Sequence, residues 1–286
     1  MQDVRTVQRA GFAPWKRSRL LNVWVDDLTV DEIVERLDND VLFTVNAVQL
    51  HTLQRDAAFA DAYRAATIVS ADGKYVFWGL AWLGRGVRAK ASGSDIVPAY
   101  WRHHANNPDV RIFLLGAGPG VAEAARERIN RLAGRDIVVD AHGPSMRFVS
   151  DDAEIDAVID RINASGATCL MVGFGAPKQE VWIARYRHRM PGVRVFMGIG
   201  ATIDYEAEAV RRAPQWMAHA GLEWLYRVLS EPRRYWRRYF ESADFLWLAL
   251  LDRFGRYRPP PFASPITETA GKGAATAGSS TVEERV

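Results

Sequence analysis

The sequence has almost no cysteine, the residue whose disulfide bonds stabilise many small secreted proteins. Its 286 residues include a single one, Cys169. No disulfide can form within such a chain, and a reducing cytosol is the expected compartment. The residues on either side of Cys169 are apolar and typical of a strand. We therefore interpret its thiol as a small core group rather than as a nucleophile.

Long apolar runs are also missing. A membrane-spanning helix needs about 18 or more consecutive apolar residues, and no stretch of the sequence reaches that length. The opening residues MQDVRTVQRA lack the apolar segment of a secretory signal. We expect neither a membrane span nor a cleaved leader.

Few residues have the spacing of metal ligands, and the histidines are scattered along the chain. Asp38-Asn39-Asp40 has the D-x-D spelling that many sugar-nucleotide enzymes use to bind a divalent cation. It stands among polar residues at an expected helix end, however, so a turn is the favoured interpretation. We therefore predict no metal site.

What the sequence does contain is a repeated alternation of short apolar runs and amphipathic stretches. Hydrophobic residues make up 48% of the chain, which suits one large or two small globular domains. After a first short strand at residues 21–28, we expect strands at residues 41–45, 66–70, 110–115, 136–141, 168–172 and 193–197. This alternation predicts an α/β fold, with a Rossmann-like, mostly parallel sheet, flanking helices and right-handed crossovers.

Local capping signals mark two of the helix starts. Thr29 precedes an amphipathic stretch, and Glu32 follows three residues later, as in a capping box. Ser150 is the expected N-cap of a helix over residues 151–164.

Composition divides the chain into four parts. Residues 1–18 are polar and aperiodic and predict a flexible lead, whereas residues 19–210 hold the α/β core. Residues 211–258 predict a helical appendage that is rich in arginine and aromatic side chains. Residues 259–286, rich in Pro, Ala, Gly, Ser and Thr, predict a disordered tail.

Glycine-rich turns follow three of the expected strands. In an open α/β sheet, ligands bind beyond the carboxyl ends of the strands, and the N-terminus of the next helix suits a phosphate. We predict a phosphate or nucleotide pocket there, with contacts from Gly116, Gly118, Gly173 and Gly175. The turn at Gly116 can equally be a plain junction of strand and helix. Its third glycine comes too early for the fingerprint G-x-G-x-x-G, which disfavours a nicotinamide cofactor.

Polar residues stand at the ends of two earlier strands. Asp72 follows the strand at residues 66–70 and precedes a glycine. It is either an ordinary turn aspartate or a general base that removes a proton from an acceptor hydroxyl. Thr44 and Asn46 end the preceding strand, where they either form a helix entry or orient a sugar or phosphate.

The appendage is strongly basic. Between residues 211 and 258 there are ten arginines and five acidic residues, interleaved with tryptophan, tyrosine and phenylalanine. The apolar run at residues 245–251 is too short to span a bilayer but suits the headgroup layer of an anionic membrane. The alternatives are a solvated helix pair packed on the core and a nucleic-acid surface. We expect an anionic membrane partner and no nucleic acid.

Several stretches of the sequence together match the pattern of one family. The longest are Val172-Gly-Phe-Gly-Ala-Pro-Lys-Gln-Glu180 and the run GLEWLYRVLSEPRR that begins at Gly221. The others are Thr44-Val-Asn46, Ala71-Asp72-Gly73, Gly93-Ser-Asp95, Leu114-Leu-Gly-Ala-Gly-Pro-Gly120 and Arg212-Ala-Pro. In this order they resemble the WecG/TagA/CpsF glycosyltransferases of bacterial cell-envelope polysaccharide synthesis, over about residues 22 to 238.

The resemblance implies an inverting transferase that moves a hexose or N-acetylhexosamine from a UDP-sugar to a polyprenyl-diphosphate-linked saccharide. It implies exopolysaccharide or other cell-envelope polysaccharide synthesis by a cytoplasmic protein that is peripheral on the inner face of the membrane. It implies no cofactor and no metal. By the same resemblance, Asp72 is the base and Thr44 and Asn46 line its pocket. Ligand contacts are implied for Gln179, Arg227, Arg234 and Arg237, the arginines binding a diphosphate.

The sequence departs from the family pattern at two places, one at the predicted substrate contact Lys90 and one just after the predicted contact Asp204. Lys90 replaces an arginine three residues before Gly93-Ser-Asp95, which keeps the charge but loses bidentate geometry. The turn after Asp204 lacks a glycine that the family usually has. A different substrate sugar is one reason for such departures.

Other functions stay open at this point. The chain can be a catalytically silent nucleotide-binding protein at the membrane, or an NAD-dependent oxidoreductase. The motifs determine neither the sugar, nor the acceptor, nor the oligomeric state, a homo-oligomer included.

Overall fold

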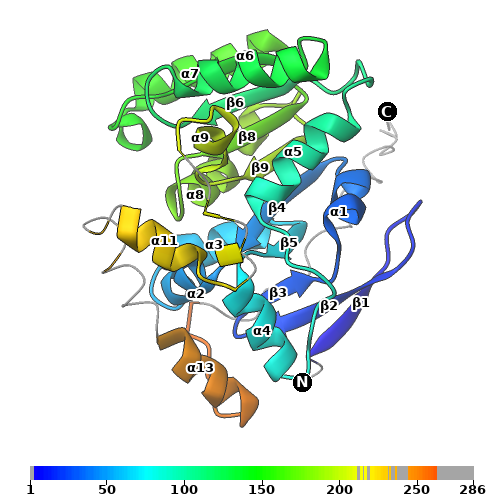
Figure 1. The fold of residues 1–286 in the computed structure, drawn as a ribbon, viewed down its shortest axis with the longest axis vertical. Helices are drawn as coiled ribbons and strands as arrows, with labels where there is room; N and C mark the ends of the chain where they lie inside the picture. The colour runs from blue at the N-terminus through cyan, green and yellow to red at the C-terminus, as the bar shows by residue number, and fades with distance from the viewer. Residues whose placement is uncertain are drawn as a thin grey trace, which may run out of the picture.

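A computed structural model describes residues 3–210, 213–214, 216–217, 220–230, 232, 236 and 244–262. At its centre lies a six-stranded parallel sheet with the order β5-β4-β9-β8-β6-β7 (Figure 1). Its strands are β4 (Asp40–Val45), β5 (Ile68–Ala71), β6 (Ile112–Gly116), β7 (Val138–His142), β8 (Cys169–Gly173) and β9 (Val195–Gly198). The predicted Rossmann-like α/β fold is confirmed.

Both faces of this sheet are buried, which is why its strands read as continuous apolar runs. In β4, Phe43 and Val45 pack into one core cluster, whereas Leu42 packs into the cluster on the other face. One face is covered by α1 (Val30–Arg36), α5 (Gly93–His103), α6 (Val121–Ala133) and α9 (Thr202–Glu206). The other is covered by α2 (Ala47–Leu53), α3 (Ala57–Ala62), α7 (Asp152–Ser165) and α8 (Lys178–Tyr186).

The two predicted caps have different outcomes. Thr29 caps α1, and Glu32 completes the predicted capping box. The prediction for α7 is wrong by one residue, because the side chain of Asp151 accepts the capping hydrogen bond from the Glu154 backbone. The Ser150 hydroxyl instead donates back to the Arg147 carbonyl, within the preceding turn of 3-10 helix at Phe148–Ser150.

The N-terminal residues form a second, antiparallel sheet of β1 (Val4–Val7), β2 (Trp15–Leu20) and β3 (Val23–Asp26). The prediction of a flexible lead over residues 1–18 is therefore wrong. The signal was weak because the buried positions of β2 include Ser18 and are separated by charged residues. β2 pairs with β3, which is buried along its whole length, and this pairing holds the polar strands in the folded structure.

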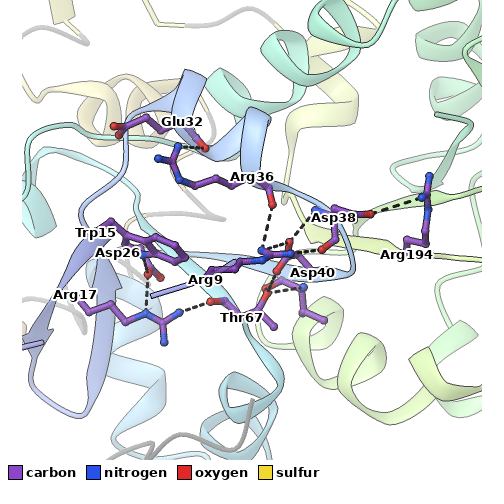
Figure 2. Close-up of polar contacts among 11 residues, drawn as sticks. Arg9, Trp15, Arg17, Asp26, Glu32, Arg36, Asp38, Asp40, Thr67 and Arg194 are labelled. Atoms are coloured by element: carbon purple, nitrogen blue, oxygen red, sulfur yellow. Dashed lines mark hydrogen bonds and ion pairs between the residues drawn. The ribbon is translucent and has the colours of Figure 1, made fainter. Parts of the chain in front are cut away.

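A buried carboxylate, Asp26, fastens this small sheet to the large one (Figure 2). One oxygen accepts hydrogen bonds from Trp15 Nε1 and Arg17 Nε, both at 2.6 Å. The other accepts from the backbone N–H of Val69 in β5 at 2.8 Å. Burial raises the pKa of the Asp26 carboxyl, although Arg17 opposes the effect. The charge is thus held by donors from both sheets, which fixes their relative position.

The Asp38-Asn39-Asp40 segment is the turn that the sequence predicts. Asn39 adopts a left-handed backbone conformation at φ 58°. Asp40 accepts hydrogen bonds from Arg9 at 2.7 Å and from the Thr67 hydroxyl at 2.6 Å, and Asp38 lies 3.7 Å from Arg194 (Figure 2). These contacts lie at the amino ends of β4 and β5.

Two helices of the C-terminal segment are described, α11 (Glu223–Ser230) and α13 (Asp244–Arg253). The ring of Phe245 packs on Gly79 of α4 (Lys74–Trp82), where a Cβ atom would lie only 3.1 Å from it. Asp252 pairs with Arg19 at 2.9 Å and with Arg85 at 2.6 Å. The predicted helical character holds for these parts, and α13 is fastened to the core at both of its ends.

Other predictions fall on residues that the structure does not describe. These are Arg212, Arg234, Arg237 and residues 263–286, which make up most of the predicted tail. In the described part of the chain, no helix has both the length and the apolar character needed to cross a membrane.

Candidate active site

The carboxyl ends of the parallel strands form one rim, and most of the predicted site residues lie along it. The connection from β6 through α6 leads to β7 at one edge of the sheet, whereas the connection from β8 through α8 leads in the opposite direction, to β9. The two helices therefore cover opposite faces of the sheet. Ligand sites of open α/β sheets lie at such a reversal. The rim is therefore the expected place of a ligand site.

The three glycine turns meet on this rim, as the sequence predicts, and they pack backbone against backbone. A Cβ atom on Gly116 would lie 2.7 Å from the Gly173 carbonyl, and one on Gly173 would lie 2.7 Å from the Gly200 carbonyl oxygen. Gly116 also has φ 136°, which favours glycine. Gly175, at φ 80°, has open space around it instead, whereas the Gly118 carbonyl oxygen lies against Gly143, where a Cβ atom would be only 2.9 Å away. Gly116 and Gly173 thus allow close packing of the turns, and a side chain at Gly175 would enter open space.

Asp72 and Asn46 are brought together at the other end of the rim. The Asp72 backbone N–H donates to the Val45 carbonyl at 2.8 Å, which extends the pairing of β5 with β4 by one residue. Asn46 Nδ2 donates to Asp72 Oδ2 at 3.2 Å. Asn46 Oδ1 accepts from the Gln49 backbone at 3.1 Å and so caps α2. Asn46 therefore serves both as helix entry and as a partner of the candidate base.

Thr44 lies in β4, two residues before Asn46, and is buried. Its carbonyl accepts a hydrogen bond from the Tyr63 hydroxyl at 2.8 Å. Burial raises the pKa of Tyr63 well above its ordinary value, and the negative charges of Glu180 and Asp72 add to the effect. Tyr63 is thus a neutral donor that supports the floor of the site.

A buried hydrogen-bond chain connects Asn46 with the glycine turns. Gln49 Oε1 accepts from the Asn46 backbone at 2.9 Å, and Gln49 Nε2 donates to Glu180 Oε1 at 3.1 Å. Gln179 Nε2 donates to the same oxygen at 2.9 Å. Gln179 Oε1 accepts from the backbones of Gly175 at 3.2 Å and Gly200 at 3.0 Å.

The position of Gln179 bears on its predicted role as a ligand contact. Its side chain is 2% exposed, and both ends of its amide are engaged inside the protein. In this arrangement it holds two rim turns in place. Sequence reasoning missed Gln49 and Glu180. Two signals in the sequence could have revealed them. Asn46 and Gln49 have the spacing of a capping box, and Glu180 is a charged residue among the apolar positions of its helix.

Lys90 lies close to the end of β5, because the next residue, Ala91, donates its backbone N–H to the Ala71 carbonyl at 2.9 Å. Lys90 Nζ contacts Asp95 Oδ2 at 2.8 Å. Burial alone would raise the pKa of Asp95, but Lys90 and the hydrogen bonds from Ser92 outweigh it and lower that pKa. Lys90 thus anchors the start of α5 beside the candidate base.

Asp204 is half-buried on α9, directly after the Gly198–Gly200 turn. The turn that follows places Glu208 at φ 57°, a left-handed conformation in which glycine is favoured. This is the turn whose usual glycine is missing from the sequence. The Glu208 side chain pairs with Arg128 at 2.9 Å.

The arginines of the C-terminal segment are only partly placed. Arg227 is a residue of α11, whose entry is held by Gly221 against Trp78 and Lys74 of α4. Since α4 begins two residues after Asp72, the start of α11 lies near the candidate base. Arg234 and Arg237 lie outside the described residues, so their role stays a prediction.

A cavity of about 520 Å³ lies elsewhere, between the N-terminal sheet and the amino ends of β4 and β5. Two of the arginines that line it, Arg9 and Arg17, are paired with Asp40 and Asp26. The cavity lies at the opposite end of the strands from Asp72, and these two ion pairs help to hold the two sheets together. The rim remains the candidate active site.

The chain matches a known protein family over most of its length. The family described as "Glycosyl transferase WecG/TagA/CpsF family" matches residues 18–259. This range contains the whole parallel sheet, the rim residues, α11 and α13.

Proposed function

Because the chain belongs to the WecG/TagA/CpsF family and is a glycosyltransferase of cell-envelope polysaccharide synthesis, we propose its donor, acceptor and stereochemistry. The donor is a UDP-sugar carrying a hexose or N-acetylhexosamine. The acceptor is a polyprenyl-diphosphate-linked saccharide. The reaction is a single displacement that inverts the anomeric carbon.

The observation that supports this proposal best is the Asp72–Asn46 pair at the rim. Asp72 takes the proton of the acceptor hydroxyl while that oxygen attacks the anomeric carbon. The bond from the anomeric carbon to UDP breaks, and UDP leaves with the electron pair. Asn46 fixes the direction of the carboxylate, because its own amide is held by the cap of α2. A base held in this way needs no reorientation during the reaction.

The donor diphosphate is proposed to lie on the glycine rim. Gly118 and Gly175 lie in the turns before α6 and α8, and no side chain caps the first N–H groups of either helix. The charge that develops on the departing UDP is stabilised by arginines of the C-terminal segment, Arg227, Arg234 and Arg237 in our proposal. A metal ion has no assigned step in this scheme.

The acceptor places the enzyme at a lipid surface. We infer a peripheral position on the inner face of the cell membrane, with the C-terminal segment as the contact. The apolar residues of α13 are followed by Arg253, Arg256 and Arg258, which is the arrangement of interfacial helices on anionic lipids.

The proposal is tested by incubating the full chain with a panel of UDP-sugars and a short-chain polyprenyl-diphosphate saccharide, with UDP release as the readout. We expect release with one donor, dependent on the acceptor, and a product of inverted anomeric configuration by NMR. A thermal shift with UDP but no release with any donor would indicate a silent nucleotide-binding protein instead. Stabilisation by NAD and not by UDP would indicate an oxidoreductase.

A further inference from the structure

The helix that follows Asp72 exposes a row of aromatic side chains. Tyr75, Trp78 and Trp82 of α4 are spaced three and four residues apart, so they share one helix face. Trp78 and Trp82 are 45% and 50% exposed, whereas Val76 and Leu80 on the inner face are buried. Exposed tryptophans gathered on one face are unusual for a surface that meets only water.

The two described helices of the C-terminal segment flank this face. On one side, Phe245 of α13 packs on Gly79. On the other, Gly221 at the entry of α11 packs on the ring of Trp78. Figure 1 shows α4 and α13 together at one end of the molecule. The aromatic face of α4 is therefore part of a surface to which the C-terminal segment also contributes.

The neighbouring part of α13 has the same apolar character. Leu246 and Trp247 are 63% and 61% exposed, and Phe254 after the helix end is exposed as well. The buried side of α13 is Phe245, Ala249 and Asp252, so these exposed residues face away from the core. The apolar area thus continues from a helix of the catalytic domain onto a helix of the C-terminal segment.

Basic side chains border this surface among the described residues. Arg253, Arg256 and Arg258 are exposed at the end of α13, and Arg253 Nη1 reaches the Leu83 carbonyl at the end of α4 at 3.5 Å. The acidic residues of α13 are engaged by cations of the core, Asp252 by Arg19 and Arg85 and Asp244 by Arg55. Tryptophan beside arginine matches the headgroup layer of an anionic bilayer.

We propose that α4 is a lipid-contacting element of the catalytic domain itself, and that it and α13 together rest on an anionic phospholipid surface. Because α4 begins two residues after Asp72, this contact places the candidate base at the level of the lipid headgroups. This last consequence rests on the proposed function, since it concerns a lipid-linked acceptor. The lipid contact of α4 does not depend on it.

The first test measures binding of the full chain to vesicles by flotation. Vesicles of phosphatidylglycerol and phosphatidylcholine are compared with phosphatidylcholine alone. We expect Trp82→Ser to weaken binding to the anionic vesicles by about tenfold, because an indole ring leaves the interface. Leu132→Ser is the matched control, since Leu132 is an exposed apolar residue of α6 at the opposite end of the molecule (Figure 1). Unchanged binding of Trp82→Ser, or an equal loss in the control, would overturn the proposal.

A second test places a reporter on α4 and does not depend on weakened binding. Trp82→Cys carries an environment-sensitive thiol dye, and Leu132→Cys carries the same dye as control. The natural Cys169 is buried, and burial raises its pKa to about 12, so it does not compete for the dye. We expect a blue shift at position 82, and none at position 132, when anionic vesicles are added. No shift at position 82 would refute the lipid contact, and a concentration-dependent shift without vesicles would instead assign the face to a second copy of the chain.

Turnover separates this inference from the proposed function. UDP release with a water-soluble short-chain acceptor, without vesicles, should be the same for Trp82→Ser and the natural chain. Normal release together with unchanged vesicle binding would refute the inference alone. Absence of release in the natural chain with every donor would refute the proposed function alone, because the vesicle tests do not require catalysis.

Discussion

Asn46 joins the entry of α2 to the candidate base, because its Nδ2 donates to Asp72 Oδ2 at 3.2 Å while its Oδ1 caps the helix. An ionised carboxylate only accepts hydrogen bonds, so Asn46 must present its NH₂ group to Asp72, and the cap through Oδ1 holds the amide in that orientation. The direction of the Asp72 carboxylate is thus set by a helix cap.

Asp72→Asn should lower turnover by roughly a thousandfold, because the amide cannot accept the proton of the acceptor hydroxyl. UDP affinity should change little, since Asp72 is not assigned to the nucleotide. Turnover is read as UDP release, and affinity as the thermal shift that UDP produces. Near-natural turnover in the Asp72→Asn variant would remove Asp72 from the role of base.

Asn46→Asp tests the pair from its other side. Aspartate caps a helix as well as asparagine does, so the variant should keep the cap of α2 and a nearly natural melting temperature in acid, and lose some stability at neutral pH, where the two carboxylates repel. It places a second carboxylate beside the first, and two close carboxylates disfavour full ionisation of both. A base must be ionised, so the acidic limb of the kcat/KM profile should move to higher pH. A profile that matches the natural one at every pH would show that the two side chains do not interact during turnover.

The buried chain through Glu180 predicts a pH-dependent stability defect in Gln179→Glu. Glu180 is 0% exposed, and the new carboxylate would replace an amide that donates to it at 2.9 Å. Two carboxylates buried side by side hold one proton between them, whereas in the unfolded chain both are ionised above about pH 5. The folded variant therefore binds one more proton than its unfolded chain. Its free energy of unfolding should fall by about 1.4 kcal/mol for each unit by which the pH rises.

Melting temperatures between pH 5.5 and 8 measure this slope. Gln8→Glu makes the same charge change at an exposed position of the N-terminal segment, and should show almost none of it. Equal slopes in the two variants would mean that Gln179 does not face a buried charge.

The sequence was informative where one local pattern decides the structure. Residues 41–45 are apolar without alternation because both faces of β4 are buried, and that pattern predicted a strand of a parallel sheet. Thr29 and Glu32 form their capping box within a single helical turn. Asp72 could be placed on the rim because it follows directly after such a strand.

Other parts of the site depend on contacts between distant residues. Gln49 and Glu180 are separated by 131 positions, so nothing in either local sequence reveals their hydrogen bond. The N-terminal strands were missed for a related reason. Their polar residues are held in the sheet by Asp26, which accepts hydrogen bonds from Arg17 in β2 and from Val69 in β5. Burial of a shared carboxylate is a property of the assembled sheets.

Lys90 provides a test of ion pairing beside the candidate base. Lys90→Met should lower the free energy of unfolding by about 1 kcal/mol or less, since both partners are partly exposed and the pair is screened. Lys90 helps to hold the pKa of Asp95 below its ordinary value, so its contribution is present at neutral pH and fades in acid as Asp95 becomes protonated. Urea unfolding at pH 7 and pH 3 measures the difference. Lys90→Arg keeps the charge and should resemble the natural chain at both values.

The docking of α13 should depend on the carboxylate near its end much more than on the one at its start. Asp252 has a side chain that is 3% exposed, and its partners Arg19 and Arg85 are 12% and 10% exposed. Asp252→Asn removes one of the two carboxylates that Arg19 and Arg85 share, since Asp3 pairs with them at 2.8 and 2.6 Å. The cost should therefore exceed that of a surface pair but stay below the roughly 3 to 5 kcal/mol of a buried charge left without any partner. Asp244→Asn weakens the contacts with Arg55, whose side chain is 54% exposed, and with His51, and should cost about 1 kcal/mol or less.

This loss should appear first as local opening, because α13 is the last helix of the described residues and contributes no strand to the parallel sheet. Hydrogen exchange of the α13 amides should therefore accelerate strongly in Asp252→Asn and little in Asp244→Asn, while exchange in β4 and β8 stays slow. Binding to anionic vesicles should weaken together with the docking of α13, since α4 would lose its neighbour on that surface. Accelerated α13 exchange with unchanged vesicle binding would separate the two helices and leave α4 as the lipid contact.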